Sequence, residues 1–375
     1  MRVVLAPDKF KNCLSAVRVA DAMAIGVRRA RPDAVIDCCP MSDGGEGFVD
    51  TMLRACGGER VTRRVTGPLP EMKVDATFGM LPDLTAVLEM SSASGIELLT
   101  DVRDHNPEAT TTFGTGELLL AAVEAGCRRI VLGIGGSATI DGGIGCCHAA
   151  GLPVLLDGGE PTSLTEPLCG RDLPRVVRIK SHRGDKLSGI EITVACDVSN
   201  PLFGDTGAAR VFGRQKGATD AQINLFDEWL RLLAIRCNVE DIALRPGAGA
   251  AGGLGFGMMA FFAAGMRPGA ELTIDATRLR DRLRGADLCI TGEGRFDAAS
   301  MAGKMPVRVA AACREAAVPC AAIFGCYDDR LEHPFRSLVS VRERTQTEAE
   351  AIARAEEFLA EASEQLAADA SNHSA

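Results

Sequence analysis

The chain has 375 residues, 46% of them hydrophobic and 24% charged, which predicts a soluble globular protein of two domains. A net charge of −9, from 41 basic and 50 acidic residues, argues against non-specific nucleic-acid binding. The most apolar stretch, residues 255–266, is too short to span a bilayer, and the apolar run from Val3 leaves no room for a signal peptide. The 14 cysteines include no Cys-x-x-Cys pair, which argues against a zinc site, and we expect them to be reduced thiols in a cytoplasmic protein. We expect no membrane or nucleic-acid partner.

The N-terminal residues alternate between strand and helix patterns, which is typical of a parallel sheet. The first strand is apolar throughout, as expected for a strand buried on both faces, and Ser15 is placed to cap the first helix. The predicted strands cover residues 3–7 and 35–39, and the predicted helices cover residues 16–30 and 46–56.

The pattern changes beyond Val61, where two strand-like runs joined by Pro82-Asp83 predict an antiparallel hairpin. Strands and helices then alternate less regularly. The hairpin covers residues 74–80 and 84–90; later strands cover 129–134, 153–156 and 190–196, and helices cover 117–125, 220–236 and the buried stretch 255–266, with a small helix after Gly142.

The regular alternation returns near the C-terminus, with strands at 287–291, 319–324 and 337–341 and helices at 306–317 and 347–368. Combined with the two N-terminal strands, these predict an α/β fold with a five-stranded, doubly wound parallel sheet. We therefore predict one discontinuous domain, residues 1–60 with 286–375, into which a second α/β domain, residues 61–285, is inserted. The active site is expected in the cleft between the two domains.

Ionisable side chains follow three strands of the predicted sheet, at the edge where doubly wound folds bind their ligands. Asp8 or Asp43 alone would be explained as a helix cap, but three such loops at one edge favour a functional site. The loops cover residues 8–12 (Asp-Lys-Phe-Lys-Asn), 42–46 (Ser-Asp-Gly-Gly-Glu) and 293–297 (Glu-Gly-Arg-Phe-Asp), with Lys304 shortly beyond.

Charge assigns roles to these side chains. Lys9, Lys11 and Arg295 are suited to hold a carboxylate or to neutralise phosphate oxygens. Acids in the same loops would repel a bare phosphate, so they favour a divalent metal or a hydroxyl substrate beside it. The acids that could ligate Mg²⁺ or orient a hydroxyl nucleophile are Asp43, Glu46, Glu293 and Asp297, together with Asp197 after the strand at 190–196.

A glycine-rich loop follows the strand at 129–134 and contains Gly133, Gly135, Gly136, Ser137 and Thr139. No Walker A sequence occurs, but glycine spacing and a later acid fit a looser dinucleotide pattern, which makes a nicotinamide-dependent dehydrogenase the second hypothesis. The break at Gly142-Gly143 counts against one long helix there. A phosphate cradle and a plain turn both remain open for this loop, as do backbone packing and ligand contact for residues 247–257.

Several motifs occur together in a fixed order. They are Ala6-Pro7-Asp8, Ser42-Asp43-Gly44-Gly45-Glu46-Gly47, Gly133-Ile134-Gly135-Gly136-Ser137-Ala138-Thr139, Cys196-Asp197-Val198, Gln215-Lys216-Gly217-Ala218 and Thr291-Gly292-Glu293-Gly294-Arg295. At these motifs, over almost its full length, the chain resembles the bacterial, type I glycerate kinase family. It departs from the family at Lys9, where Ser is usual, at Asn12, where Gly is usual, and at Arg308, where a small residue is usual.

The resemblance implies a flavodoxin-like domain with an inserted α/β domain. It also implies ATP-dependent phosphorylation of a small organic acid, D-glycerate, with Mg²⁺, commonly giving 2-phosphoglycerate. A non-catalytic regulator that binds a sugar acid is the third hypothesis, although the chain lacks a DNA-reading module. The position of phosphorylation, and whether the protein is a monomer or a homodimer, stay open.

Specific roles follow from the resemblance together with the charges. We expect Lys11 and Arg295 to hold the glycerate carboxylate, and Asp197 or Asp43 to orient its hydroxyl. Lys9 and Ser42 are expected to join in substrate binding, Glu293 or Asp297 to bind Mg²⁺, and the loop from Gly133 to Thr139 to contact phosphates through its N–H groups.

Overall fold

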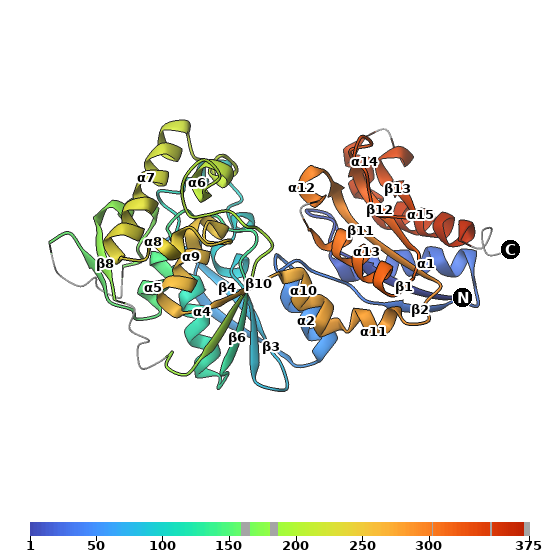
Figure 1. The fold of residues 1–375 in the computed structure, drawn as a ribbon, viewed down its shortest axis with the longest axis horizontal. Helices are drawn as coiled ribbons and strands as arrows, with labels where there is room; N and C mark the ends of the chain where they lie inside the picture. The colour runs from blue at the N-terminus through green and yellow to red at the C-terminus, as the bar shows by residue number, and fades with distance from the viewer. Residues whose placement is uncertain (159–165, 181–186, 302, 346, 371–375) are drawn as a thin grey trace. The chain divides into compact units, whose positions relative to one another are not determined.

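The computed structural model describes residues 1–158, 166–180, 187–301, 303–345 and 347–370, which form two compact units (Figure 1). Unit 1 contains residues 1–43 and 270–375, and unit 2 contains residues 44–269. Unit 1 is therefore built from both ends of the chain. None of the helices in the described ranges is both long and apolar enough to cross a membrane.

Unit 1 is built on a five-stranded sheet in the order β13-β12-β11-β1-β2, and all neighbouring strands are parallel. Counted along the chain, this order is 2-1-3-4-5, as in doubly wound folds. The predicted five-stranded parallel sheet is confirmed. The strands are β1 (Arg2–Pro7), β2 (Val35–Cys38), β11 (Leu288–Phe296), β12 (Cys320–Tyr327) and β13 (Ser337–Ser340).

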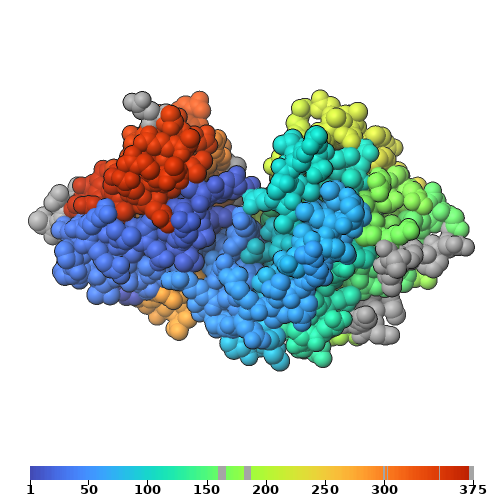
Figure 2. Space-filling view, turned by 180° about the vertical axis from the view of Figure 1, so that it is seen from behind, coloured from blue at the N-terminus to red at the C-terminus, as the bar shows by residue number. Residues whose placement is uncertain are grey.

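Helices cover both faces of this sheet, each with its own apolar core. On one face, α1 (Ala16–Ala30) packs along α15 (Ala355–Asp369), and Figure 2 shows the red C-terminal helix against the blue N-terminal residues. The other face is covered by α10 (Gly269–Thr277), α11 (Leu279–Leu283) and α13 (Met305–Glu315). The shorter elements of this unit are α12 (Ala298–Met301), η5 (Val341–Arg344) and α14 (Glu348–Ala353).

Local sequence explains how α1 begins and which side of it is buried. The Oγ atom of Ser15 accepts a hydrogen bond from the backbone N–H of Arg18 at 3.4 Å, as predicted for a helix cap. Val19, Met23 and Val27 are fully buried, and their spacing of four residues puts them on one side of the helix.

The C-terminal helix differs from its prediction. Residues 347–368 contain no glycine or proline, so the sequence predicts one continuous helix. The structure has two helices, α14 and α15, which meet at Arg354, where φ is −113° and ψ is 23°. Its guanidinium is held by Glu350 and Glu357 and lies over the ring of Phe358, so these side-chain contacts accompany the break.

Unit 2 is built on a six-stranded sheet in the order β10-β9-β6-β5-β4-β3. β3, β4 and β5 pair antiparallel, which confirms the predicted hairpin, whereas β5, β6, β9 and β10 run parallel. The strands are β3 (Glu59–Thr66), β4 (Lys73–Met80), β5 (Thr85–Glu89), β6 (Arg129–Gly133), β9 (Glu191–Ala195) and β10 (Gly265–Arg267), and a separate antiparallel pair joins β7 (Val154–Leu156) to β8 (Val176–Ile179).

The helices of unit 2 lie close to their predicted positions, apart from several short ones that the sequence pattern does not indicate. They are α2 (Phe48–Cys56), α3 (Ser91–Ser94), α4 (Phe113–Glu124), α5 (Ile144–Ala149), α6 (Ala208–Phe212), α7 (Asp220–Cys237), α8 (Glu240–Ala243) and α9 (Ala250–Phe262), with 3₁₀ turns η1 (Ile96–Leu98), η2 (Val102–Asp104), η3 (Gly170–Arg175) and η4 (Arg214–Lys216).

The unit boundaries lie at residues 43/44 and 269/270, whereas the sequence placed them at 60/61 and 285/286. Helix α2 accounts for the first difference, because it packs on β4 and β5 and the N–H of Val49 donates to Glu89 Oε1 at 2.6 Å. Helices α10 and α11 account for the second, because Ile274 and Leu279 are buried in the core that also contains α13.

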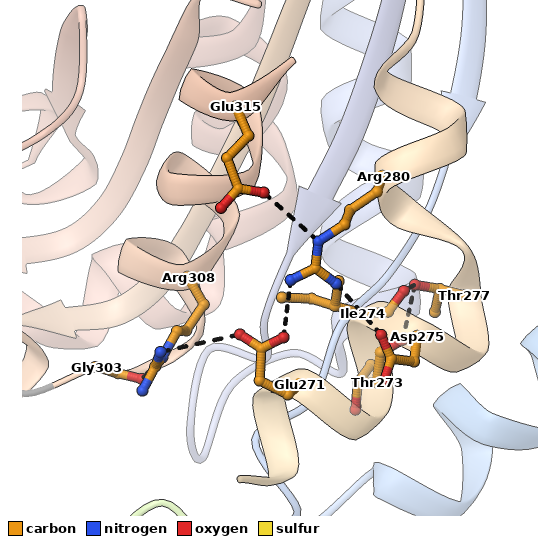
Figure 3. Close-up of polar contacts among 9 residues, drawn as sticks. All are labelled: Glu271, Thr273, Ile274, Asp275, Thr277, Arg280, Gly303, Arg308 and Glu315. Carbon is orange, nitrogen blue, oxygen red and sulfur yellow. Dashed lines mark hydrogen bonds and ion pairs between the residues drawn. The ribbon is translucent and has the colours of Figure 1, made fainter.

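An ion-pair network ties α10 and α11 to α13 in unit 1 (Figure 3). Arg280 contacts Glu271 at 2.9 Å, Asp275 at 3.2 Å and Glu315 at 3.6 Å. Arg308, one of the departures from the family pattern, lies 3.9 Å from Glu271. Exposed pairs of this kind contribute little individually, about 0–1 kcal/mol each, so Arg308 has a surface role here.

Candidate active site

The carboxyl ends of β1, β2 and β11 meet at one edge of the unit 1 sheet. Asp8 follows β1 directly, Ser42 and Asp43 follow β2, and Glu293 lies near the end of β11. β1 and β11 are neighbours in the middle of the sheet. β2, which follows β1, lies toward one edge of the sheet, and β12, which follows β11, lies toward the other edge. Such a reversal of strand order is the position where doubly wound folds bind their ligands.

Three acids influence one another at this edge. Burial and then the charge of Asp43 raise the pKa of Asp8 well above its ordinary value. Burial raises the pKa of Glu293 to about 7, with Asp43 adding to the shift and Lys304 opposing it. The Lys304 ammonium lies 3.9 Å from a carboxylate oxygen of Glu293. Burial thus disfavours the ionised forms of Asp8 and Glu293, and a bound cation would stabilise those forms.

Two buried polar atoms at this edge have no hydrogen-bond partner among the described residues. They are the Oγ atom of Ser42 and the Oε1 atom of Glu293. The carbonyl of Ser42, by contrast, accepts from the Thr273 hydroxyl at 2.6 Å. Buried polar atoms are rarely left unpaired in proteins, so these two mark a place where a ligand would complete the structure.

Asp297 has a structural use that the sequence pattern does not reveal. One of its carboxylate oxygens accepts from the backbone N–H of Ser300 at 3.2 Å, which caps the short helix α12. Its charge also raises the pKa of Glu293, although burial is the larger cause. Asp297 is thus close enough to Glu293 for their charges to interact. One of its carboxylate oxygens is already hydrogen-bonded at the start of α12.

The acids are spaced more widely than a closed metal cage requires. Within the described ranges, the one set of three metal-binding side chains whose ligand atoms lie within 4.8 Å of one another is Cys289, Cys313 and Cys320. These thiols are buried in the apolar core between the sheet and α13, and they include none of the predicted metal ligands. A wide arrangement of acids suits Mg²⁺, which keeps several waters and takes only one or two carboxylates.

A pocket of about 360 Å³ opens in unit 1. Lys11 and Arg295, both exposed and both predicted to hold the substrate carboxylate, line this pocket, and Arg342 from η5 adds a third cation. Phe10 and Ile352 form part of its apolar wall. Glu348 also lines the pocket, which therefore combines three cations, one acid and an apolar wall, and the excess of positive charge suits a small organic anion.

The glycine-rich loop of unit 2 starts where β6 ends. β6 pairs with β9, and Gly133 lies opposite Ala195 in the register. Asp197, half-buried, follows Ala195 by two residues. The loop and Asp197 thus lie at the carboxyl ends of neighbouring parallel strands, whereas Asp43 belongs to unit 1.

Backbone packing explains the first two glycines of this loop. A Cβ atom on Gly133 would lie 2.3 Å from the carbonyl oxygen of Gly44, and one on Gly135 would lie 2.8 Å from the Cα atom of Gly45. The next two residues differ, because the N–H groups of Gly136 and Ser137 have no hydrogen-bond partner in the described part of the chain. Part of the loop is therefore a packing surface, and part offers free donors to an anion.

Lys216 is attached to this loop and was not among the predicted site residues. Its side chain is only 2% exposed, and its ammonium donates to Ser137 Oγ and to the carbonyl of Thr139, each at 2.7 Å. Burial lowers the pKa of Lys216 to about 7, with Asp141 opposing the shift. The Gln215-Lys216-Gly217-Ala218 motif was the signal that could have identified it.

The stretch at residues 247–257 packs against the same loop. Residues 251–253 all have positive φ, which breaks the start of α9. A Cβ atom on Gly252 would lie 1.9 Å from the carbonyl oxygen of Thr139, and one on Gly257 would lie 2.9 Å from that of Gly142. Close backbone contact is thus what these glycines provide.

The comparison with known proteins adds evidence over the whole chain. The sequence model of the glycerate kinase family matches residues 3–371. The chain belongs to the glycerate kinase family. It is an enzyme of the kinase class, and neither the dehydrogenase nor the binding-regulator hypothesis is supported.

Relatives in the glycerate kinase family match at nearly full length. A glycerate kinase of Halalkalibacterium halodurans is 41% identical over 97% of this chain and 97% of its own. A glycerate 2-kinase of Escherichia coli K12 is 40% identical over 98% of this chain and 97% of its own. A crystal structure of a Salmonella typhimurium LT2 protein assigned as glycerate kinase 2 covers 100% of this chain and 99% of its own, with 37% identity and a TM-score of 0.82.

The structure accounts for two departures from the glycerate kinase pattern near the site. Asn12 has φ 59°, a left-handed conformation that Gly adopts freely and that Asn tolerates better than most residues, so the backbone turn is kept. The backbone N–H of Lys9 donates to Asp8 Oδ1 at 2.7 Å, and its ammonium opposes the burial-driven rise in the pKa of Asp8. Lys9 therefore adds a cation beside the acids.

Asp8 is the acid of this site that the sequence analysis did not select. Its carboxylate is 5% exposed and interacts with Asp43 and Glu293, yet as a single residue after a strand it resembled a helix cap. Lys304 was noticed only as a residue beyond the third loop. The roles assigned to the predicted site residues stay predictions, and the structure adds Asp8, Lys304 and Lys216 to them.

Proposed function

We propose that this enzyme transfers the γ-phosphoryl group of ATP to the 2-hydroxyl of D-glycerate, with Mg²⁺, giving 2-phosphoglycerate and ADP. The observation that carries the proposal is the group of interacting acids Asp8, Asp43 and Glu293 in the same unit as a pocket lined by Lys11 and Arg295. Phosphoryl transfer requires mostly positioning and charge stabilisation, and this set supplies groups of both signs. The glycerate 2-kinase relative supports the choice of the 2-hydroxyl.

In this reaction the hydroxyl oxygen of glycerate forms a bond to the γ-phosphorus, and the bond from that phosphorus to the β,γ-bridging oxygen breaks. The hydroxyl proton passes to a carboxylate, for which Asp43 and Asp197 are the candidates. Lys11 and Arg295 hold the glycerate carboxylate from their common pocket, with Lys9 and Ser42 nearby in unit 1. These contacts fix the hydroxyl in position for attack.

The acid cluster fits a magnesium ion in the nature of its donors. Glu293 carries a buried oxygen without a partner, and its pKa is raised by burial and by neighbouring carboxylates. A divalent cation would satisfy that oxygen and offset the repulsion, with Glu293 and Asp297 holding it. When bound, Mg²⁺ neutralises charge on the β- and γ-phosphates.

Under this proposal, each unit carries residues for a different part of the reaction. Unit 1 binds glycerate and the metal, whereas the loop from Gly133 to Thr139 in unit 2 binds the phosphate chain through its free N–H groups. Asp197, at the end of the neighbouring strand, belongs with that loop. A cytoplasmic location accords with the 14 cysteines, none of which is in a disulfide.

The test is to identify the product of purified enzyme with ATP, Mg²⁺ and D-glycerate by phosphorus NMR, with L-glycerate as the control substrate. We expect the 2-phosphoglycerate resonance, conversion of the product by enolase without a mutase, and no product when Mg²⁺ is chelated. A 3-phosphoglycerate resonance would overturn the regiochemistry. Absence of any phosphorylated glycerate under saturating substrates would overturn the function.

A further inference from the structure

Lys216 is a buried lysine that forms no ion pair with any acid in the described ranges. The Lys216 ammonium donates hydrogen bonds to two neutral oxygens, the hydroxyl of Ser137 and the carbonyl of Thr139. Burying an ammonium costs several kcal/mol unless an opposite charge or a full set of hydrogen bonds compensates it. The chain nevertheless keeps a lysine at this buried position, in contact with the loop that carries the N–H groups of Gly136 and Ser137.

The nearest acid is already occupied. Asp141 accepts hydrogen bonds from the N–H and hydroxyl of Thr112, at 2.8 Å and 2.7 Å, and from the N–H of Gly143 at 3.0 Å. It acts on Lys216 only as a charge, because no ion pair joins the two within the described residues. Asp141 is thus a structural acid that shapes the turn, and the ammonium still lacks a direct counter-charge.

Another polar group at the same place is unsatisfied. The hydroxyl of Thr139 is fully buried and has no hydrogen-bond partner within the described residues. Thr139 is also the residue whose carbonyl accepts from Lys216, so the unpaired hydroxyl and the uncompensated cation lie together. Buried polar groups left unpaired in this way indicate a missing partner. The Lys216 ammonium, the Thr139 hydroxyl and the N–H groups of the loop can all donate hydrogen bonds, so that partner would be an anion.

We propose that Lys216 is a positioning residue, which holds Ser137 and Thr139 so that the loop can bind the phosphates of ATP. The positive charge of Lys216 then balances part of the negative charge of those phosphates. The inference rests on the proposed function, since it takes ATP as the phosphoryl donor. It assigns a role to the Gln215-Lys216-Gly217-Ala218 motif that the loop glycines alone do not explain. The ligand class is a polyphosphate anion.

Other charged groups around Lys216 are paired among themselves. On its own element η4, Arg214 pairs with Asp220 at 2.7 Å, and on the neighbouring α6, Arg210 lies 3.7 Å from Asp227. From the remaining side, Gly217 packs against the backbone carbonyl of His105 and not against its ring nitrogens. Lys216 is therefore the group expected to change protonation when an anion arrives, since its own pKa is lowered to about 7 by burial.

The first experiment compares Lys216→Met with wild type in steady-state kinetics. We expect the KM for ATP to rise roughly 10- to 100-fold, the range for loss of a charge-assisted hydrogen bond, while the KM for D-glycerate stays within about twofold. Lys180→Met is the matched control, because Lys180 is exposed in the same unit. Equal KM values for ATP in wild type and Lys216→Met would overturn the proposal.

The second experiment measures proton uptake when Mg–ATP binds at pH 8 without glycerate, by calorimetry in buffers of different ionisation enthalpy. Wild type should take up between about half and one proton more than Lys216→Met, because the bound anion favours the ammonium. Ser137→Ala, which keeps the lysine, should retain the uptake. If Lys216→Met does not fold, wild type decides alone, and absence of uptake overturns the proposal.

The two proposals fail in different ways. If the enzyme binds Mg–ATP but does not phosphorylate glycerate, the proposed function is overturned and the proposed role of Lys216 is kept. Absence of any Mg–ATP binding to wild type would remove ATP as the ligand of both.

Discussion

The pH dependence of stability is the most direct physical consequence of burying Lys216. Lys216→Met keeps a side chain of similar length and removes the titratable group. Burial lowers the pKa of Lys216 from 10.5 to about 7, so between these values the unfolded chain binds a proton that the folded chain lacks. Stability therefore rises with pH in that window, and below it both states are protonated and the lysine contributes no slope.

The magnitude follows from one proton per molecule. A difference of one bound proton changes the free energy of unfolding by about 1.4 kcal/mol per pH unit. From pH 7.5 to 9.5, wild type should thus gain on the order of 2–3 kcal/mol relative to Lys216→Met. Because the cysteines titrate equally in both proteins, their contribution cancels in the difference.

Trp229 provides the assay, since it is the only tryptophan, lies in α7 of unit 2 and contacts the ring of Phe226 at 5.2 Å. Urea unfolding followed by its fluorescence, without ligands, gives stability at pH 6, 7.5, 8.5 and 9.5. Ser137→Ala and Lys180→Met should keep the wild-type slope, because both retain Lys216. Parallel curves for wild type and Lys216→Met would refute the argument that the buried amine loses its proton.

Further predictions concern the proposed roles and the packing of the loop. Asp43→Asn and Asp197→Asn should each lower kcat by about 100-fold or more if the residue is the proton acceptor, with the circular dichroism spectrum unchanged; wild-type kcat in both variants would contradict the assignment. Lys11→Ala should raise the KM for D-glycerate by about tenfold with little change in kcat, and an unchanged KM would remove Lys11 from the substrate pocket. Gly252→Ala should destabilise unit 2 by more than about 2 kcal/mol in urea unfolding, because the new Cβ atom would lie 1.9 Å from the Thr139 carbonyl oxygen. Gly126→Ala is the control for that last change, since its φ is also positive, at +95°, but nothing lies within 4 Å; equal losses would show that backbone strain, not contact, is what matters.

The elements predicted correctly are those with a strong local pattern. Helix α1 has a cap and regular apolar spacing, and the strands of unit 1 are apolar runs between turn residues. The sequence did not predict β3, β8 or β10, and the reasons for β3 and β10 differ. β3 is an edge strand whose exposed positions include Arg63 and Arg64, so it lacks an apolar signature. β10 has only three residues, and an apolar helix precedes it directly.

The sequence identified site residues best where ionisable side chains directly follow a predicted strand. It identified them least well where the role of a residue depends on contacts with distant parts of the chain. β11 was expected to end at residue 291, because Gly292 and Gly294 read as a loop, but it continues to Phe296. Glu293 and Arg295 are consequently strand residues held by pairing with β12. Nothing local distinguishes Lys216 from a surface lysine, since its burial comes from contacts with residues about 80 positions earlier.

The two readings of the glycine-rich loop are therefore not alternatives. Gly133 and Gly135 admit the backbone at Gly44–Gly45, and Gly252 admits the Thr139 carbonyl. Lys216 fixes the same stretch from its buried side. A loop packed on so many sides loses little freedom when an anion binds, and donors held in place before binding contribute more than donors that must first be ordered. Tight packing at four positions is thus the physical condition that would let Gly136 and Ser137 act as a phosphate cradle.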